Sequence, residues 1–474
     1  MAGATTQGTQ KYFTTHPHFK SRKLGSTGFS VSPFGFGSYR ISETEPAHIE
    51  ALKKALESGI NLIDTSSNYG DGSGGAEKLI GQILEDQFRI GKIERSEIVL
   101  VTKVGYVQGK NLTEAKSRIE NNQGWPDMVT YQDNIWHNIS PEYLNEQIIN
   151  SLTNLRVECI DVLLVHNPEY FLKTSHQKDV YYARIKKAFE FLESQVEAGR
   201  IQYYGISSNT FIDPESSFEN TSLEKCFSLA RDVKKNNHFA VAQFPFNLFE
   251  NQAATLKNNS GKTLLEFAAE HKIGTLANRP LNALLRGKMN RLVSYPIYDV
   301  VKVKGDLHRV LGRVVELEKK NLSSQRTQGL LWGQALRENL QQLDDIIEWR
   351  EVLYRQILPS LESALNRLPS TSEKWALEYR ESALELLALI TKNLESMGAQ
   401  RAQILIEQIA TTSPDSKSAP TLSNAVLSLY TSLPQLSSVL VGMRTPEYVE
   451  DCLGATTAIS EKIVLETLQS FLKR

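Results

Sequence analysis

Short runs rich in β-branched residues alternate with amphipathic helical stretches along the chain as far as residue 282. The run 60–63 reads as a buried strand, and apolar residues recur at helical spacing in the stretch 48–58 before it. The same alternation predicts strands at 34–37, 60–63, 98–102, 160–165, 203–206, 240–244, 274–277 and 438–441. Parallel strands joined by helices form either an open doubly wound sheet or a closed barrel. Eight strand candidates favour a (β/α)8 TIM barrel, whose catalytic face lies at the C-terminal ends of the strands.

The alternation is interrupted between Ala283 and Pro420. Strand signals vanish there, and Leu and Val recur at helical spacing, as in Leu307, Val310 and Val314. We expect an inserted all-α bundle of about three to five helices over 283–420, which splits the α/β barrel into 21–282 and 421–474. Because the insertion follows the seventh strand, we expect it to overhang the cofactor or substrate mouth, or to pair subunits. Residues 1–20 are expected to form a flexible tail.

Composition argues against several classes of function. Lys and Arg number 53 against 54 Asp and Glu, so the chain lacks a basic field for nucleic acid or an anionic membrane. It contains no apolar run of about 18 residues, and its first twenty residues are polar and lack the apolar core typical of a secretory signal. Its three cysteines form no C-x-x-C pair, which argues against a disulfide framework or a cysteine zinc site. We expect a cytoplasmic protein that binds no metal, nucleic acid or membrane.

A glycine-rich stretch, residues 70–75 with the sequence GDGSGG, satisfies the G-x-G-x-x-G pattern of dinucleotide-binding loops. That pattern is followed about 20 residues later by an acidic residue that binds the ribose. Here the next predicted strand ends in Thr102 and Lys103 instead. We therefore interpret the stretch as a loop that lets a helix begin, and a Rossmann domain is the weaker alternative.

Four polar residues lie at or just beyond the ends of consecutive predicted strands: Asp64, Tyr69, Lys103 and His166. Tyrosine, with a pKa of about 10, is a poor acid at neutral pH, but a nearby ammonium lowers that pKa. Lys103 would have this effect on Tyr69, Asp64 would hold the lysine, and His166 would add a hydrogen bond to the same substrate oxygen. Such a group polarises a carbonyl and protonates the developing alkoxide. None of the four side chains can supply the electron pair that reduces the carbonyl carbon, so a hydride carrier is needed.

These motifs resemble the aldo-keto reductases. The resemblance covers roughly 20–282 and 421–460 and rests on several segments: Leu24–Gly28, Gly35–Tyr39, Gly59–Ser66 with Tyr69–Gly70, Val101–Lys103, Ser151–His166, Gly205–Asn209, Gln243 and Val439–Glu447. It implies a TIM barrel that binds NADPH across the strand ends. It also implies that Tyr69 is the general acid, that Lys103 and Asp64 tune it, and that His166 orients a small-molecule carbonyl substrate.

The resemblance further implies a set of cofactor-binding residues. Ser207, Asn209 and Gln243 are expected to bind the nicotinamide carboxamide, with Gly37 and Ser38 near the nicotinamide end. The remaining candidates are Arg279 and Leu281 near the pyrophosphate, and Gly442, Arg444 and Thr445 at the adenosine phosphate. The family commonly has a lysine at the position of Gly442, and often Arg and Asn at the positions of Tyr448 and Cys452. NADH is therefore a second candidate cofactor. The Arg444 guanidinium alone can still bind the 2′-phosphate of NADPH through two hydrogen bonds.

Three functions remain open at this point. The first is an NADP-dependent oxidoreductase that reduces an aldehyde or ketone to an alcohol, or runs in reverse. The second is a dinucleotide-binding regulatory subunit whose helical insertion binds a partner protein or forms an oligomer. The third is a barrel lyase in which Lys103 forms a Schiff base. The segment 106–139 is expected to be a long loop. Its Trp125, Tyr131, Trp136 and His137 either line the substrate pocket or pack together and hold the loop in place.

Overall fold

The computed structural model describes residues 3–70, 72–285, 287–321, 332–368, 373–455 and 458–472. Asp71 of the glycine-rich stretch therefore lies outside the described residues. The chain divides into two compact units, one formed by Met1–Leu292 with Ile409–Arg474 and the other by Val293–Gln408. The first bound differs from the predicted 282 because a hairpin, β15 (Asn282–Leu285) paired with β16 (Lys288–Arg291), extends the first unit. The second bound differs from the predicted 421 because residues 409–420 also belong to the first unit.

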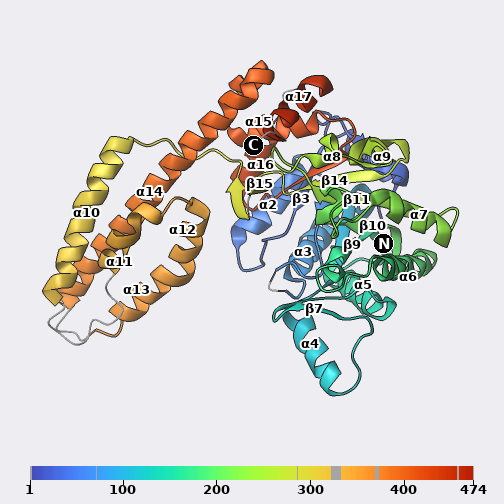
Figure 1. Ribbon diagram of the computed structural model, residues 1–474, viewed down its shortest axis with the longest axis horizontal. Coiled ribbons are helices and arrows are strands. Elements are labelled where there is room, and N and C mark those ends of the chain that lie inside the picture. The colour runs from blue at the N-terminus through green and yellow to red at the C-terminus, as the bar shows by residue number, and fades with distance from the viewer. Residues whose placement is uncertain are drawn as a thin grey trace. The chain divides into compact units, whose positions relative to one another are not determined.

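The first unit is built around a closed barrel of eight parallel strands, which confirms the predicted fold (Figure 1). In chain order the strands are β3 (Phe34–Gly37), β4 (Leu62–Asp64), β5 (Val99–Val104), β9 (Ile160–His166), β10 (Ile201–Ser207), β11 (Phe239–Pro245), β14 (Gly274–Asn278) and β17 (Ser438–Val441). Each strand pairs with its neighbours in this order, and β17 closes the barrel by pairing with both β14 and β3. All eight lie where the sequence predicted strands.

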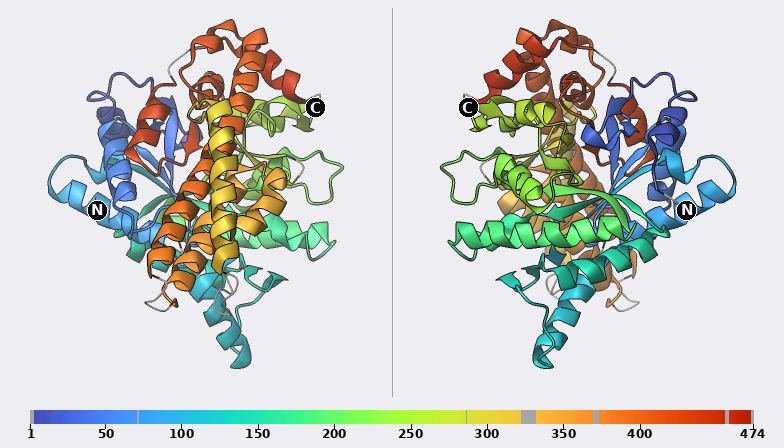
Figure 2. Two further views of the ribbon diagram at one scale, coloured as in Figure 1. Left: turned by 90° about the vertical axis from the view of Figure 1, so that its left-hand side faces the viewer. Right: turned by 90° about the vertical axis from the view of Figure 1, so that its right-hand side faces the viewer.

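Helices cover the outside of this barrel and return the chain to the start of each strand (Figure 2). They are α2 (Pro46–Glu57), α3 (Gly75–Arg89), α5 (Pro141–Leu155), α6 (Lys178–Glu197), α7 (Leu223–Val233), α9 (Leu264–Glu270), α15 (Leu422–Thr431), α16 (Pro446–Leu453) and α17 (Glu461–Leu472). Their starts follow local chemistry. The Ser140 side chain accepts from the backbone N–H of Tyr143 at the start of α5, and Thr263 and Glu266 form a capping box at the start of α9.

The barrel interior is filled by aliphatic side chains from alternate strand positions. At its N-terminal end, the hairpin of β1 (Arg22–Lys23) and β2 (Ser30–Val31) contributes Leu24 and Phe29 to the same core. Gly25, with φ of +55°, lies so close to the backbone of Gly274 at the start of β14 that no Cβ would fit. The hairpin therefore closes this end of the barrel, and the other end is left for the polar residues that follow the strands.

The N-terminal segment is helical, so the prediction of a flexible tail over 1–20 is wrong for the residues described. Helix α1 (Thr6–Tyr12) is capped by Thr5, and Ala4, Thr9 and Tyr12 are buried. The Ala4 N–H donates to Asp161 Oδ1 at 2.6 Å, and the Tyr12 hydroxyl donates to the Leu56 carbonyl. A single helix of two turns is too short to show a clear apolar period, and its stability comes from these contacts with the barrel.

The segment 106–139 is also more regular than the long loop expected from its sequence. It contains α4 (Gly109–Glu120) and a three-stranded sheet of β6 (Tyr106–Val107), β8 (Ile135–His137) and β7 (Val129–Gln132). Trp125 is buried and packs on Tyr143, with 5.1 Å between ring centroids, whereas His137 turns toward the strand ends. Strand β6 pairs with β8 across the whole of α4, which a local pattern does not reveal, whereas β7 and β8 are neighbours in the sequence.

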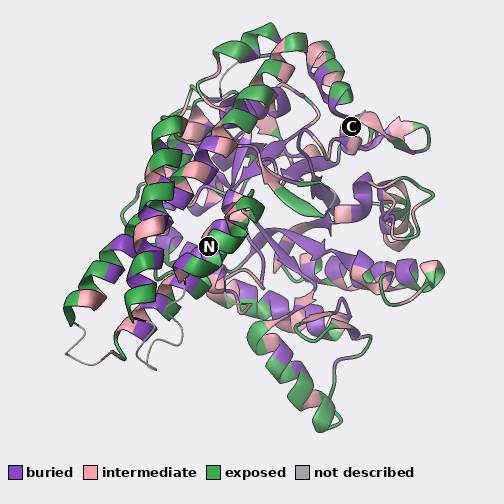
Figure 3. Ribbon diagram, turned by 60° about the vertical axis from the view of Figure 1, so that its left-hand side comes forward, coloured by how far each residue is buried: buried purple, intermediate pink, exposed green. Residues whose placement is uncertain are grey.

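The inserted unit follows β14 and precedes β17, and it is helical as predicted. Its helices are α10 (Val300–Asn321), α11 (Trp332–Asn339), α12 (Ile346–Val352), which continues through a π-helical turn into α13 (Leu358–Leu365), and α14 (Glu373–Thr412). Each helix is buried along one face and exposed along the other (Figure 3). Leu307, Val310 and Val314, singled out by their spacing, all belong to its core. Its role as a lid or a subunit contact stays a prediction.

No helix among the described residues is both long enough and apolar enough to cross a membrane.

Candidate active site

A buried ion pair lies at the C-terminal ends of β4 and β5. Lys103 Nζ donates to Asp64 Oδ2 at 2.8 Å and to the Thr65 carbonyl at 2.7 Å, and it lies 3.4 Å from the Tyr69 hydroxyl. These three contacts use all three ammonium protons. The Lys103 side chain is fully buried. A Schiff base at this nitrogen would keep at most one of the three protons and so break at least two of these contacts, which argues against the lyase.

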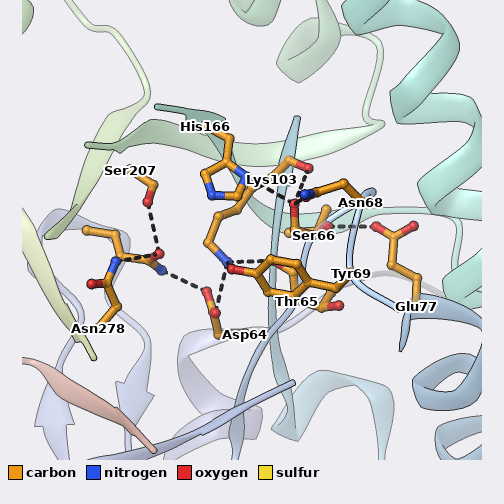
Figure 4. A network of polar contacts seen from close by, with 12 residues as sticks. Asp64, Thr65, Ser66, Asn68, Tyr69, Glu77, Lys103, His166, Ser207 and Asn278 are labelled. Carbon is orange, nitrogen blue, oxygen red and sulfur yellow. Dashed lines mark hydrogen bonds and ion pairs between the residues drawn. The ribbon is translucent and has the colours of Figure 1, made fainter. Parts of the chain in front are cut away.

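Tyr69 lies in the loop that leads from β4 to α3, with its ring over the lysine. Lys103 Nζ is 4.7 Å from the ring centroid, and Figure 4 shows the phenol oxygen directed at the ammonium. Because the oxygen accepts from Lys103, its own proton remains available. No acceptor for that proton exists in the part of the chain that the structure describes, so a ligand can take it.

The electrostatics of Tyr69 differ from the sequence-based expectation. Burial, followed by the negative charge of Asp64, raises the pKa of the phenol well above its usual value of about 10. Burial also raises the pKa of the Asp64 carboxyl and lowers that of the Lys103 ammonium, and each partner opposes the other's shift through its charge. The expected lowering of the tyrosine pKa by lysine was therefore wrong for this protein. Tyr69 stays protonated at neutral pH, as a proton donor must.

His166 ends β9 and faces the same site. Its Nδ1 lies 3.1 Å from Ser66 Oγ, and its backbone carbonyl lies 2.7 Å from the His137 ring. Burial, followed by the positive charge of Lys103, lowers the pKa of His166 well below 6.5, so the ring is neutral at pH 7. The Tyr69 and His166 rings are 6.1 Å apart and nearly perpendicular. The structure thus brings together all four residues that the sequence predicted to be catalytic.

A chain of amide and hydroxyl groups continues the network across the barrel mouth (Figure 4). Gln243 Nε2 donates to Asp64 Oδ1 at 2.7 Å, while Gln243 Oε1 accepts from Ser207 Oγ at 2.9 Å and from Asn278 Nδ2 at 3.3 Å. That Gln243 binds the nicotinamide carboxamide stays a prediction, and in the structure its amide group also holds the Asp64 carboxylate. Asn278 was missed, although it directly follows a predicted strand, as the other site residues do.

Several polar atoms along this rim lack a hydrogen-bond partner among the described residues, including Ser38 Oγ and Asn278 Oδ1. Both are buried, and an unsatisfied buried polar atom is costly unless a ligand or water pairs with it. Gly37 ends β3 beside Ser38. Arg279 has a positive φ of +54° and donates to Glu250 Oε1 at 2.7 Å, so a carboxylate already offsets its charge.

Three arginines gather where β3, β17 and the β15–β16 hairpin end. Arg40 follows β3 and Arg444 follows β17, two strands paired through Val441 and Phe36, while Arg291 ends β16. Burial, then the positive charge of Arg291 and finally that of Arg40, lowers the pKa of Arg444. Within the described ranges none of the three has a carboxylate within 4 Å. We call Arg40, Arg291 and Arg444 the arginine cluster; sequence reasoning found Arg444 alone.

The predicted neighbours of Arg444 frame this cluster. Gly442 is exposed, and a Cβ there would meet open space. The Thr445 hydroxyl accepts from the Tyr448 N–H and caps α16. Leu281, by contrast, is tied into the hairpin, where its carbonyl accepts from the N–H of Leu292.

Glu169 is a buried carboxyl group behind Asn209, and the sequence did not single it out. Its Oε1 accepts from the Asn209 N–H at 2.9 Å and its Oε2 accepts from Ser208 Oγ at 3.0 Å. Burial raises its pKa from an ordinary 4.5 to about 7, while the hydrogen bonds and Lys173 oppose that shift. Glu169 therefore positions a predicted cofactor residue and titrates near neutral pH.

This titration predicts a dependence of stability on pH. The folded pKa exceeds the unfolded one, so the folded state keeps a proton that the unfolded state loses between about pH 4.5 and 7. The free energy of unfolding should therefore fall by about 3 kcal/mol as the pH rises through that window. Glu169→Gln cannot titrate and should lose this dependence in thermal melts at pH 5 and pH 8. The exposed Glu120→Gln should behave like the wild type; an equal slope in all three proteins would contradict the assignment.

Comparison with known proteins agrees with this geometry. The model of the aldo/keto reductase family matches residues 33–311. The chain is 30% identical over 196 residues to 6-dehydroglucose reductase of Novosphingobium aromaticivorans, covering 40% of this chain and 51% of that protein. It is also 30% identical over 155 residues to NADH-specific methylglyoxal reductase of Escherichia coli, covering 31% and 41%. The matched part of the chain thus spans about half of the first relative and less of the second.

Among solved structures, the aldo-keto reductase AKR11C1 from Bacillus halodurans in its holo form covers 96% of both chains, at 17% identity and a TM-score of 0.48. The family model spans more than half of the sequence and includes seven of the eight barrel strands. The chain belongs to the aldo/keto reductase family.

Proposed function

We propose that this protein is an oxidoreductase that uses NAD(P)H to reduce an aldehyde or ketone to an alcohol, or runs the reverse reaction. The observation that carries the proposal is the Tyr69 hydroxyl, which faces the Lys103 ammonium while Asp64 and the Thr65 carbonyl hold that ammonium in place. This arrangement suits a proton donor for a carbonyl oxygen. The aldo/keto reductase membership supports the same reaction class.

Each residue has a defined part in that reaction. Tyr69 donates a hydrogen bond to the carbonyl oxygen and passes its proton there as negative charge develops. Lys103 stabilises the phenolate that remains, and Asp64 with Gln243 keeps Lys103 in place. The bound nicotinamide cofactor supplies the hydride that reaches the carbonyl carbon. An alkoxide is a stronger base than a phenolate, so Tyr69 can donate its proton even though burial raises its pKa.

The rim of the barrel suits a dinucleotide. The unpaired buried atoms Ser38 Oγ and Asn278 Oδ1 offer hydrogen bonds to amide and hydroxyl groups. The arginine cluster offers unpaired cations to phosphate oxygens at the other end. We propose that Ser207 and Asn209 complete the nicotinamide end and that the arginine cluster binds the adenosine 2′-phosphate. NADPH is then preferred over NADH, even though Gly442 replaces the family's common lysine.

The cofactor preference should depend on the arginine cluster. Arg291→Gln and Arg444→Gln are each expected to weaken NADPH binding about 10- to 100-fold, because a hydrogen bond to a charged group contributes about 1.5–3 kcal/mol. NADH lacks the 2′-phosphate and should bind nearly as to the wild type. Parallel fluorescence titrations with both cofactors measure this. Arg89→Gln, an exposed arginine on α3, is the control and should bind both cofactors like the wild type. If the cluster variants lost affinity for NADPH and NADH equally, the cluster would not bind the 2′-phosphate.

The proposed function as a whole is tested by turnover. We expect NADPH fluorescence to report binding, and NADPH to be consumed with at least one carbonyl compound in a panel that includes methylglyoxal and 6-dehydroglucose, the compounds in the names of the two relatives. Cofactor binding without turnover across the panel would reject the enzyme in favour of the second candidate.

That second candidate is a dinucleotide-binding regulatory subunit whose inserted unit binds a partner protein or a second copy. Two apolar side chains favour it, because Ile297 and Val301 in the inserted unit are 91% and 84% exposed. Deletion of the inserted unit would then abolish the association while cofactor binding persists.

A further inference from the structure

A chain of buried hydroxyl groups leads away from the Glu169 carboxyl group. Ser208 Oγ lies 3.0 Å from Glu169 Oε2. The contacts continue from Ser208 Oγ to Thr210 Oγ1 at 3.2 Å, from Thr210 Oγ1 to Thr221 Oγ1 at 3.0 Å, and from Thr221 Oγ1 to the Tyr181 hydroxyl at 2.7 Å. All five residues are buried, and none is more than 7% exposed. Each hydroxyl therefore depends on its neighbours in the chain for hydrogen bonds.

The number of protons in this hydroxyl chain favours an ionised Glu169. With a carboxylate at one end, every hydroxyl donates to the next group toward Glu169, so the four hydroxyl protons fill the four contacts. A protonated Glu169 adds a fifth proton. Oε1 cannot hold it without opposing the Asn209 N–H, and a proton on Oε2 reverses the chain and leaves the Tyr181 proton without an acceptor among the described residues. An unpaired buried donor is costly, so the chain stabilises the carboxylate.

Burial has the opposite effect, because a buried carboxylate is destabilised unless a cation compensates its charge. Among the described residues no lysine or arginine forms an ion pair with Glu169, and Lys173 acts on it only through space. Burial raises the pKa of Glu169 to about 7, while its hydrogen bonds and Lys173 oppose that shift. The other titratable groups that act on Glu169 are neutral at this pH: Tyr106 on β6, Tyr181 on α6 and Cys226 on α7. Glu169 therefore lacks a full counter-charge, and its ionisation responds to a positive charge nearby.

Glu169 lies directly behind the residues proposed to bind nicotinamide. Its two oxygens accept from the Asn209 N–H and from Ser208, which follow Ser207 at the end of β10. The oxidised nicotinamide ring carries a positive charge, and the reduced ring does not. We propose that Glu169 is a positioning residue that responds to this charge: it is ionised when the oxidised cofactor is bound and protonated when the reduced cofactor is bound. The inference rests on the proposed function for the place of the nicotinamide.

The oxidation state of the cofactor and the ionisation of Glu169 are then coupled, and such a coupling is reciprocal. Between about pH 6 and pH 8, the affinity for NADP⁺ should rise about tenfold relative to that for NADPH, within the usual range of couplings between two sites. Both cofactors carry the same 2′-phosphate. The ratio of their affinities therefore cancels any titration of that phosphate at the arginine cluster.

Calorimetry tests the coupling without any turnover, because the heats of binding in two buffers with different ionisation enthalpies report the protons released. A tenfold coupling moves the pKa by one unit, so at pH 6.5 the wild type should release about half a proton more with NADP⁺ than with NADPH. Glu169→Gln cannot ionise and should lose this difference. Tyr69→Phe should keep it, because the pKa of the Tyr69 phenol lies well above neutral pH. The matched control is Glu193→Gln, which removes another buried carboxyl group, one that accepts from the N–H of His238, and should behave like the wild type.

Ser208→Ala provides a second test that does not depend on the folding of Glu169→Gln. It removes the hydroxyl that donates to Oε2, which raises the pKa of Glu169, so the change in the affinity ratio should move to higher pH. An unmoved change would contradict the role of the hydroxyl chain. Equal proton release with both cofactors in the wild type, or a difference that persists in Glu169→Gln, would overturn the proposal and leave the proposed function standing. If neither cofactor binds, the proposed function itself fails, and the role of Glu169 fails with it.

Discussion

Tyr69→Phe is expected to lower kcat for carbonyl reduction by about 10²- to 10⁴-fold, the usual contribution of a positioned general acid. The substitution removes only the hydroxyl beside Lys103 Nζ and keeps the ring that covers this ammonium at 4.7 Å. NADPH affinity should therefore change little. Steady-state kinetics together with a cofactor titration separate the two effects.

The control for this experiment is Tyr354→Phe, a loss of the same hydroxyl from a side chain that is 65% exposed in the inserted unit. It should keep wild-type kinetics. If Tyr69→Phe retained the wild-type kcat on its best substrate, another group would have to donate the proton and the assignment of Tyr69 would be wrong.

The second large effect concerns stability, at the opposite end of the barrel. Asp161 is fully buried on β9, where Oδ2 accepts from Arg95 Nη2 at 2.8 Å and from the Leu100 N–H at 2.7 Å. Oδ1 accepts from the Ala4 N–H and from Gln202 Nε2. Asp161→Ala leaves the buried guanidinium of Arg95 without its counter-charge. Loss of one partner from such a pair costs about 3–5 kcal/mol of the free energy of unfolding.

Urea denaturation followed through the barrel's unfolding transition measures this loss. The comparison is Asp86→Ala, which breaks the exposed pair with Arg89, whose side chain is 71% exposed. Exposed pairs contribute at most about 1 kcal/mol. If the free energy of unfolding of Asp161→Ala lay within 1 kcal/mol of that of Asp86→Ala, the network around Asp161 would have no special role in holding α1 to the barrel.

The barrel could be predicted because each strand is a short, continuous run of buried aliphatic residues, which needs no knowledge of its neighbours. The structure extends several runs by a polar residue, such as His166 on β9, Ser207 on β10 and Asn278 on β14. The hydropathy pattern ends each of these strands one residue too early, because the last residue of the strand is a polar residue of the candidate site. The same reason explains why Asp64, Lys103 and His166 could be found from sequence.

The remaining site residues depend on contacts between distant segments. Arg291 approaches Arg444, more than 150 residues later in the chain, only because the β15–β16 hairpin turns the chain back. Burial raises the pKa of Glu169, and the N–H of Asn209, forty residues further along the chain, donates a hydrogen bond that opposes this shift. The link between Ser66 and His166 spans a hundred residues. Spacing along the sequence does not predict contacts between segments so far apart. It does show which polar residues directly follow a predicted strand.

The place of β17 in the barrel has a consequence for biosynthesis. It is the last barrel strand to leave the ribosome, after the whole of Val293–Gln408, yet it supplies the pairing for both β14 and β3. Until it arrives, a seven-stranded sheet carries two unpaired edges, and such edges promote association with other chains. Chains cut short before Ser438 should therefore aggregate while the inserted helices are already complete. A nascent chain of this protein has the greatest need of a chaperone during that interval.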